Sequence, residues 1–160
     1  MPMKEPDKIS AAADRLRASC SRREYCSSEV MKKALKLLDG NQDEAGKVLA
    51  MLMKEGYVDD ARYAGAFCRD KASLAGWGEV KIRYMLRAKG LSQSTIDQAL
   101  EEVDVEKASD RLERLLSTKL RSLKKDDPQI RLKLIRYALG RGYSYDRVSD
   151  LTDRLLNTEQ

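Results

Sequence analysis

The stretch that decides the fold runs from Gly56 to Leu91 and reads GYVDDARYAGAFCRDKASLAGWGEVKIRYMLRAKGL. It holds the only tryptophan and the only phenylalanine of the 160-residue chain. Seven basic and two acidic residues lie between Arg62 and Lys89. The whole chain has 31 basic and 26 acidic residues, so the remainder carries 24 of each. The basic excess is therefore concentrated in one patch, which favours binding to anions or to acidic partners.

Length and composition favour one helical domain or a short array of small helical units. Charged residues make up 36% of the chain and apolar residues 42%, which suits thin units with much exposed surface. Leu, Ala, Lys, Arg, Glu and Met are abundant, and these residues are strong helix formers. Three prolines and a single phenylalanine argue against an all-β fold.

An internal repeat emerges when the chain is compared with itself. A shift of 50 residues places Gly40 on Gly90, and a shift of 52 places Gly90 on Gly142. The first shift also places Glu29 and Val30 on a second Glu-Val pair. A period near 50 predicts tandem units, each of which buries its apolar face partly against its neighbours.

Each unit is predicted to contain three helices, because apolar residues recur every three or four positions and no stretch alternates long enough to predict a strand. The expected helices span 11–24, 27–39 and 42–55, then 59–73, 78–89 and 92–103, then 105–124, 128–140 and 144–156. The predicted organisation is a flexible tail over 1–10 and three-helix units over 11–56, 57–104 and 105–160. The fold class is all-α, with three tandem units in an elongated, curved array.

Glycine and serine mark the predicted helix ends. Gly40, Gly90 and Gly142 stand where a helix ends and a left-handed residue is wanted. Ser92 and Ser144 follow the second and third of these glycines as expected N-caps. An apolar residue separates glycine from serine in both cases, which predicts a hydrophobic staple across the start of the next helix.

The basic block has two interpretations. In the first, two helices of the middle unit present their cations to a phosphate backbone or an acidic protein groove, because guanidinium groups suit phosphate and carboxylate. In the second, the same side chains form a solvated helix face. The candidate contact residues are Arg62, Arg69, Lys71, Lys81, Arg83, Arg87 and Lys89.

Trp77 between two glycines is also open to two interpretations. It could be exposed and stack on a base or a partner side chain. Alternatively it fills the gap between two helices, while Gly76 and Gly78 allow the sharp turn. We favour the second, because a single tryptophan in a helical domain usually packs inside.

Signals for enzymatic chemistry are poor. The chain has no histidine, which removes the commonest general base and the commonest zinc ligand. The segment GNQDEAGK from Gly40 to Lys47 has the wrong glycine spacing for a phosphate loop, and no strand precedes it. We therefore expect no catalytic site, no metal and no cofactor.

The sequence predicts a soluble cytoplasmic protein. Three cysteines, an odd number at loose spacing, fit a reducing compartment better than a disulfide scaffold. The first ten residues lack the apolar core of a secretory signal. No run approaches the roughly 20 apolar residues of a membrane span.

The middle unit resembles the signature of a known family. It is similar to the signature of the RecX family, regulators of RecA recombinase, at Gly56-Tyr57-Val58-Asp59-Asp60, Arg62-Tyr63-Ala64, Phe67, Arg69-Asp70, Gly76-Trp77-Gly78, Lys81-Ile82-Arg83, Leu86 and Lys89-Gly90-Leu91. The flanking units resemble the family more weakly. One departure is Asn41, a polar residue after the glycine, which leaves the register of the first unit open.

The resemblance implies a function that is not enzymatic. Such proteins bind along the groove of the RecA filament on DNA and inhibit its ATPase, strand-exchange and co-protease activities. The seven basic residues named above then become candidate contacts with the filament or its DNA. The protein is expected to be monomeric, with the RecA filament and single- or double-stranded DNA as partners, and with no membrane partner.

Two other hypotheses remain at this point. The chain could be a stand-alone DNA-binding protein that uses helix-turn-helix-like units, since it has capped three-helix units and basic helices. It could also be a helical scaffold similar to tetratricopeptide arrays, although a period near 50 does not fit their 34-residue repeat.

Overall fold

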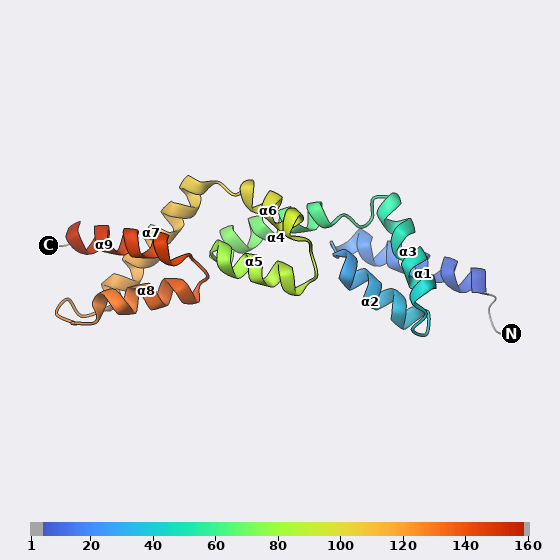
Figure 1. Ribbon diagram of the computed structural model, residues 1–160, viewed down its shortest axis with the longest axis horizontal. Coiled ribbons are helices and arrows are strands. Elements are labelled where there is room, and N and C mark those ends of the chain that lie inside the picture. The colour runs from blue at the N-terminus through green and yellow to red at the C-terminus, as the bar shows by residue number, and fades with distance from the viewer. Residues whose placement is uncertain (1–4, 159–160) are drawn as a thin grey trace.

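The protein is an elongated array of α-helices (Figure 1). The computed structural model describes the backbone of residues 5–158 and the side chains from residue 7 to 158, and no strand occurs in this part. The helices are α1 (Glu5–Arg22), α2 (Ser27–Leu37), α3 (Gln42–Lys54), α4 (Asp60–Ser73), α5 (Glu79–Ala88), α6 (Gln93–Glu101), α7 (Val105–Ser122), α8 (Ile130–Gly140) and α9 (Tyr145–Thr158). Apart from the start of α1, every helix end lies within two residues of its predicted position.

The helices form three successive triplets, each around its own hydrophobic core. Extensive helix–helix contacts occur within α1–α3, within α4–α6 and within α7–α9. Leu16, Val48 and Leu52 are central to the first core. The second core includes Ile82, Leu86 and Ile96, and the third includes Leu112, Leu116 and Leu134. The prediction of an all-α protein made of three tandem three-helix units is confirmed, and the triplets follow one another along the long axis in Figure 1.

The N-terminal segment differs from the prediction of a flexible tail over 1–10. Helix α1 already begins at Glu5, so residues 5–10 are helical, while residues 1–4 lie outside the described residues. Proline and acidic residues suit the first turn of a helix, and Pro6 and Asp7 occupy that turn. Ile9 then packs against the first core, which gives the extra turn a buried contact.

The turns that follow α5 and α8 have the predicted hydrophobic staples, whereas the turn that follows α2 has a polar cap and no staple residue before it. Leu91 lies in the second core and Tyr143 in the third, each only 6% exposed. In the first unit Asn41 is itself the N-cap of α3, and its side chain accepts a hydrogen bond from the Glu44 amide at 3.1 Å. The first unit therefore has no apolar residue between its glycine and its cap.

The joint between the first and second units combines burial with polar contacts. Cys26, the N-cap of α2, is 0% exposed and belongs to the second core. Asp60 accepts hydrogen bonds from the Ser27 amide at 2.7 Å and from the Ser27 hydroxyl at 2.6 Å. The Ser28 hydroxyl donates to the Lys89 carbonyl at the C-terminal end of α5. The N-terminus of α2 is thereby fastened to the end of α5.

The joint between the second and third units is a direct contact of two backbones. The amides of Gly78 and Val80 donate to the carbonyls of Arg141 and Gly142, each at 2.9 Å. A Cβ atom added at Gly78 would overlap the Gly142 backbone, and one added at Gly142 would overlap Lys81. Gly142 also has a φ of 93°, which disfavours any side chain. Both glycines are therefore required for the end of α8 to meet the start of α5.

We expect Gly78→Ala to lower the free energy of unfolding by about 1–3 kcal/mol, because the added methyl group forces the two backbones apart. Urea denaturation followed by circular dichroism measures this change. Gly140→Ala is the matched control, since its Cβ would meet nothing within 4 Å and an alanine in a helix is slightly favourable. Equal stability of the two variants would show that the close approach does not constrain the joint.

Candidate functional site

The middle helix of each triplet carries the basic excess of the folded protein. Together α2, α5 and α8 have nine basic and two acidic side chains, whereas the other six helices have sixteen basic and fifteen acidic ones. The nine are Lys32, Lys33, Lys36, Lys81, Arg83, Arg87, Arg131, Lys133 and Arg136. The basic excess therefore lies on the middle helix of every unit, and not only in the stretch from Arg62 to Lys89.

The two joints bring these three helices into line. The turn after α8 is bonded to the start of α5, and the end of α5 is bonded to the start of α2. In Figure 1 α8, α5 and α2 follow one another along the lower edge of the molecule. We call these three helices the helix row. Its members meet carboxyl end to amino end, so their dipoles are arranged favourably.

Several cations of the helix row are available for a partner. Lys32, Lys36, Arg87 and Arg136 are exposed, and none of them has a carboxylate within 4.0 Å in the part of the chain that the structure describes. Tyr84 of α5 is 70% exposed and lies one turn from Arg87. Exposed guanidinium and ammonium groups beside an open aromatic ring are typical of surfaces that bind nucleic acids or acidic proteins.

Three of the seven predicted contact residues are held in ion pairs. Arg62 donates from Nε to Glu24 at 2.7 Å and also to the Gly56 carbonyl at 3.0 Å, which fastens α4 to the end of the first unit. Arg83 contacts Asp97 of α6 at 2.5 Å. The hydrogen bond and charge of Glu24 raise the pKa of Arg62. These cations therefore stabilise the fold, whatever else they contact.

Lys89 is the third ion-paired residue of the seven. Its Nζ lies 3.6 Å from Glu29 of the first unit and 5.8 Å from the centre of the Tyr63 ring. Burial alone lowers the pKa of Lys89, but Tyr63 and Glu29 outweigh it and raise the pKa overall. Lys89 thus crosses the joint between the first two units.

Lys71 and Lys81 lie over the ring of Trp77. Their Nζ atoms are 4.8 Å and 4.3 Å from the ring centre, within the range of cation–π attraction. Phe67 packs edge-on against the same ring at 6.2 Å. Trp77 is partly buried and packs against the second core, as expected of a residue that fills the gap between helices.

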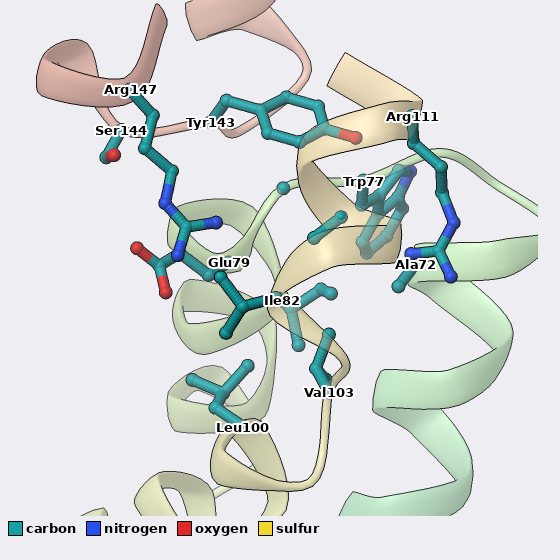
Figure 2. Close-up of a pocket in the computed structure, with 13 residues that line it drawn as sticks. Ala72, Trp77, Glu79, Ile82, Leu100, Val103, Arg111, Tyr143, Ser144 and Arg147 are labelled. Carbon is teal, nitrogen blue, oxygen red and sulfur yellow. The ribbon is translucent and has the colours of Figure 1, made fainter. Parts of the chain in front are cut away.

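A cavity of about 70 Å³ separates Trp77 from the third unit (Figure 2). Ile82, Leu100 and Val103 line it on the side of the second unit. Tyr143 lies on the opposite side, and its hydroxyl donates to the Gly76 carbonyl at 3.3 Å. Burial raises the pKa of Tyr143. The cavity between these two units is therefore small.

The remaining two predicted residues, Arg69 and Arg87, are exposed and have no ion pair among residues 7–158. Arg87 is part of the helix row, whereas Arg69 lies on α4. Lys81 and Arg83 also belong to the row, and Lys89 is the C-cap residue of α5. The predicted residues of α5 therefore belong to the helix row and those of α4 do not, although Lys71 of α4 and Lys81 of α5 meet over the ring of Trp77.

Sequence inspection missed the basic residues of the row in the outer units, above all Lys32, Lys36 and Arg136. The signal was present, because the second helix of every unit has more basic than acidic residues. It was obscured by acidic residues in the neighbouring helices, which cancel this charge when it is counted along the chain.

Two family models match the chain. The model described as RecX, second three-helix domain, matches residues 59–100, and the model described as RecX, third three-helix domain, matches residues 106–151. These ranges coincide with the second and third triplets of helices.

Relatives and solved structures agree with these matches. A regulatory protein RecX of Pseudomonas entomophila is 32% identical over 131 residues, which is 82% of this chain and 83% of the relative. A regulatory protein RecX of Clostridium botulinum strain Eklund 17B is 35% identical over 128 residues. This chain covers 78% of its own length in that match, but only 59% of the clostridial relative.

Two crystal structures share the fold. The structure of RecX from Lactobacillus salivarius has a TM-score of 0.84 at 20% identity, and the match covers 96% of this chain and 99% of that one. Another crystal structure of a regulatory protein RecX has a TM-score of 0.82 at 24% identity and covers 93% and 73%.

The fold and the helix row define a class of protein: a helical tandem-repeat protein whose three repeats each have a basic middle helix. The chain belongs to the RecX family of regulatory proteins. Within residues 5–158, no helix combines the length and the apolar character needed to cross a bilayer.

The carboxylate of Glu29 makes two contacts at the first joint. It accepts a hydrogen bond from the Cys26 amide at 3.0 Å and lies 3.6 Å from Lys89. Burial raises the pKa of Glu29, but the contacts with Cys26, Lys89 and Arg23 outweigh it and lower the pKa overall. A carboxyl with a lowered pKa stabilises the fold above its unfolded pKa of about 4.3 and loses that contribution as the pH falls below it.

We therefore expect the free energy of unfolding to fall between pH 6 and pH 3, and to fall less in Glu29→Gln, which cannot lose this charge. Urea denaturation at both pH values measures the difference. Glu101→Gln, at an exposed position of α6, serves as the control. If Glu29→Gln showed the same decline as the wild type, Glu29 would not contribute to acid sensitivity.

Proposed function

We propose that this protein regulates a RecA recombinase by binding the RecA–DNA filament and restraining its ATPase, strand-exchange and co-protease activities. Membership of the RecX family supports the choice of partner. The observation that carries the proposal is the helix row, because a filament is a long polyanionic ligand and the row is a long cationic surface.

The dimensions of the row suit a polymer. Its helices contain 11, 10 and 11 residues, which corresponds to about 50 Å at a rise of 1.5 Å per residue. DNA of B-form length presents about 15 phosphates per strand over that distance. The row is thus long enough to contact many phosphates, or the acidic surfaces of neighbouring filament subunits.

The joints explain how binding could restrain a filament. Backbone hydrogen bonds hold α8 against α5, and the Ser28 hydroxyl holds the start of α2 against the end of α5. We infer that the row moves as one piece. A rigid ligand that fits one filament conformation stabilises that conformation at the expense of others. Filament activities that require subunits to change conformation would then slow down.

A second function, stand-alone DNA binding, is favoured by the same row but requires no RecA. The two proposed functions differ in what the basic residues of the helix row contact. In the filament regulator, inhibition of RecA at substoichiometric or equimolar amounts is expected, whereas a stand-alone DNA-binding protein would inhibit only by covering free DNA.

The test is DNA-dependent ATP hydrolysis by RecA. The wild-type protein should slow hydrolysis when it is equimolar with RecA or scarcer. The double variant Arg87→Glu and Arg136→Glu should raise the half-inhibitory concentration by about tenfold or more, because two attractive charges in the row become repulsive. The matched control is Lys47→Glu with Lys54→Glu, two exposed cations of α3 outside the row.

No inhibition by the wild-type protein over a wide concentration range would refute the RecA assignment. Equal inhibition by the two double variants would instead remove the helix row from the contact surface. Far-ultraviolet circular dichroism should show unchanged helix content in both variants, since all four side chains are exposed.

A second prediction concerns direct contact with DNA. If Arg87 and Arg136 each neutralise one phosphate of a single strand, their double reversal should reduce the slope of log affinity against log salt by roughly 1.4. Fluorescence anisotropy with a labelled oligothymidine at several salt concentrations measures the slope. An unchanged slope would assign both residues to contacts with protein rather than DNA.

A further inference from the structure

Every unit has an equivalent end, formed by the last turn of its first helix, the N-cap of its second helix and the last turn of its third helix. We call it the distal end. In the first unit it includes Cys26, in the second Gly78 and in the third Gln129. Comparison of the three N-caps shows whether each distal end is covered by another unit.

The distal ends of the first two units are covered by the unit that follows. Cys26 and Gly78 are buried, and each lies against a turn with a left-handed glycine. Gly90 approaches Ser28 at the first joint, and Gly142 meets Gly78 at the second. An apolar residue, Leu91 or Tyr143, follows each glycine and is buried.

Within residues 7–158, no segment covers the distal end of the third unit. Its N-cap Gln129 is exposed, unlike its two counterparts. A hollow of about 610 Å³ lies there, against about 70 Å³ left at the covered end of the second unit. Leu120, Leu123, Ile130 and Leu156 line it. These leucine and isoleucine side chains occupy the place that a fourth unit would cover.

Charge around the hollow indicates the character of its occupant. Arg121 and Lys125 line it, both are exposed, and neither has a carboxylate within 4.0 Å in the described part of the chain. Among the side chains of residues 7–158, no acidic one lines the hollow. An occupant with acidic groups beside an apolar side chain would match both features.

The opposite end of the chain does not supply this occupant. The turn after α2 has a left-handed glycine, Gly40, but the cap Asn41 follows it directly. No leucine or tyrosine stands between them, unlike in the other two units. Terminal repeats commonly have a polar outer face that prevents end-to-end association, and the first unit follows this rule.

We propose that the hollow at the distal end of the third unit binds a partner protein. The segment it takes is the C-terminal turn of a helix, with a left-handed glycine followed by leucine or an aromatic residue, in acidic surroundings. A turn of this kind lies against the same end of the first and second units, and the acidic flanks match Arg121 and Lys125.

The chain itself can be converted into the probe. A leucine inserted between Gly40 and Asn41 recreates the glycine–apolar–cap order of the other units, and Asp39, Asp43 and Glu44 supply acidic flanks. This variant should associate end to end, in a ladder of species that does not close, at least about tenfold more strongly than the wild type. Sedimentation velocity over a range of concentrations measures the association.

Two further variants locate the contact. Leu123→Glu, added to the insertion, should restore wild-type behaviour, because it places a charge in the hollow. Leu74→Glu, at a residue that is 85% exposed on the second unit, should leave the association unchanged. Circular dichroism shows whether each variant keeps its helices.

Three outcomes would overturn the proposal. The folded insertion variant could sediment as the wild type does, which would show that the hollow does not accept such a turn. Its association could survive Leu123→Glu, which would place the contact elsewhere. The wild-type protein could itself associate in a manner abolished by Leu123→Glu, which would make a second copy the occupant.

Discussion

The arrangement of this protein depends on the contact between two glycines, Gly78 and Gly142, at which two backbones touch without side chains between them. Amides at the start of α5 donate hydrogen bonds to carbonyls at the end of α8. Each helix end thereby pairs backbone groups that have no partner within their own helix. Because a Cβ at either position would overlap its neighbour, the two helices meet end to end and at short range. The first joint repeats this arrangement less tightly, with the Ser28 hydroxyl donating to the carbonyl of Lys89.

Alignment of the middle helices brings basic residues from all three units into one row. Each of α2, α5 and α8 has only a small net charge, and acidic residues elsewhere balance it along the chain. Placed end to end, the three helices concentrate nine cations over about 50 Å. Part of the remaining basic charge has another use. Arg62 and Lys89 pair with Glu24 and Glu29 across the first joint, where they hold the units in line.

The repeat also explains the difference between the two ends of the array. A unit in a tandem array buries one end against the unit that follows, so the residues at that end are apolar. The turn that meets this end belongs to the following unit and carries Leu91 or Tyr143. The first unit has no predecessor in the described array, and its turn is shortened and polar at Asn41. The third unit retains the apolar distal end without a described successor to cover it.

Local patterns in the sequence determined the helices, their number per unit, the glycine turns and the staples at Leu91 and Tyr143, because capping and helical periodicity act between residues that are close in the chain. The sequence also indicated that α5 is basic. It could not show that Arg62 pairs with Glu24, 38 residues away, or that Lys71 and Lys81 cover Trp77. Only the tertiary structure decided which cations remain free and that the middle helices lie in a row. Both depend on how the ends of separate units meet, and a contact such as that between Gly78 and Gly142 leaves no periodic trace in either segment.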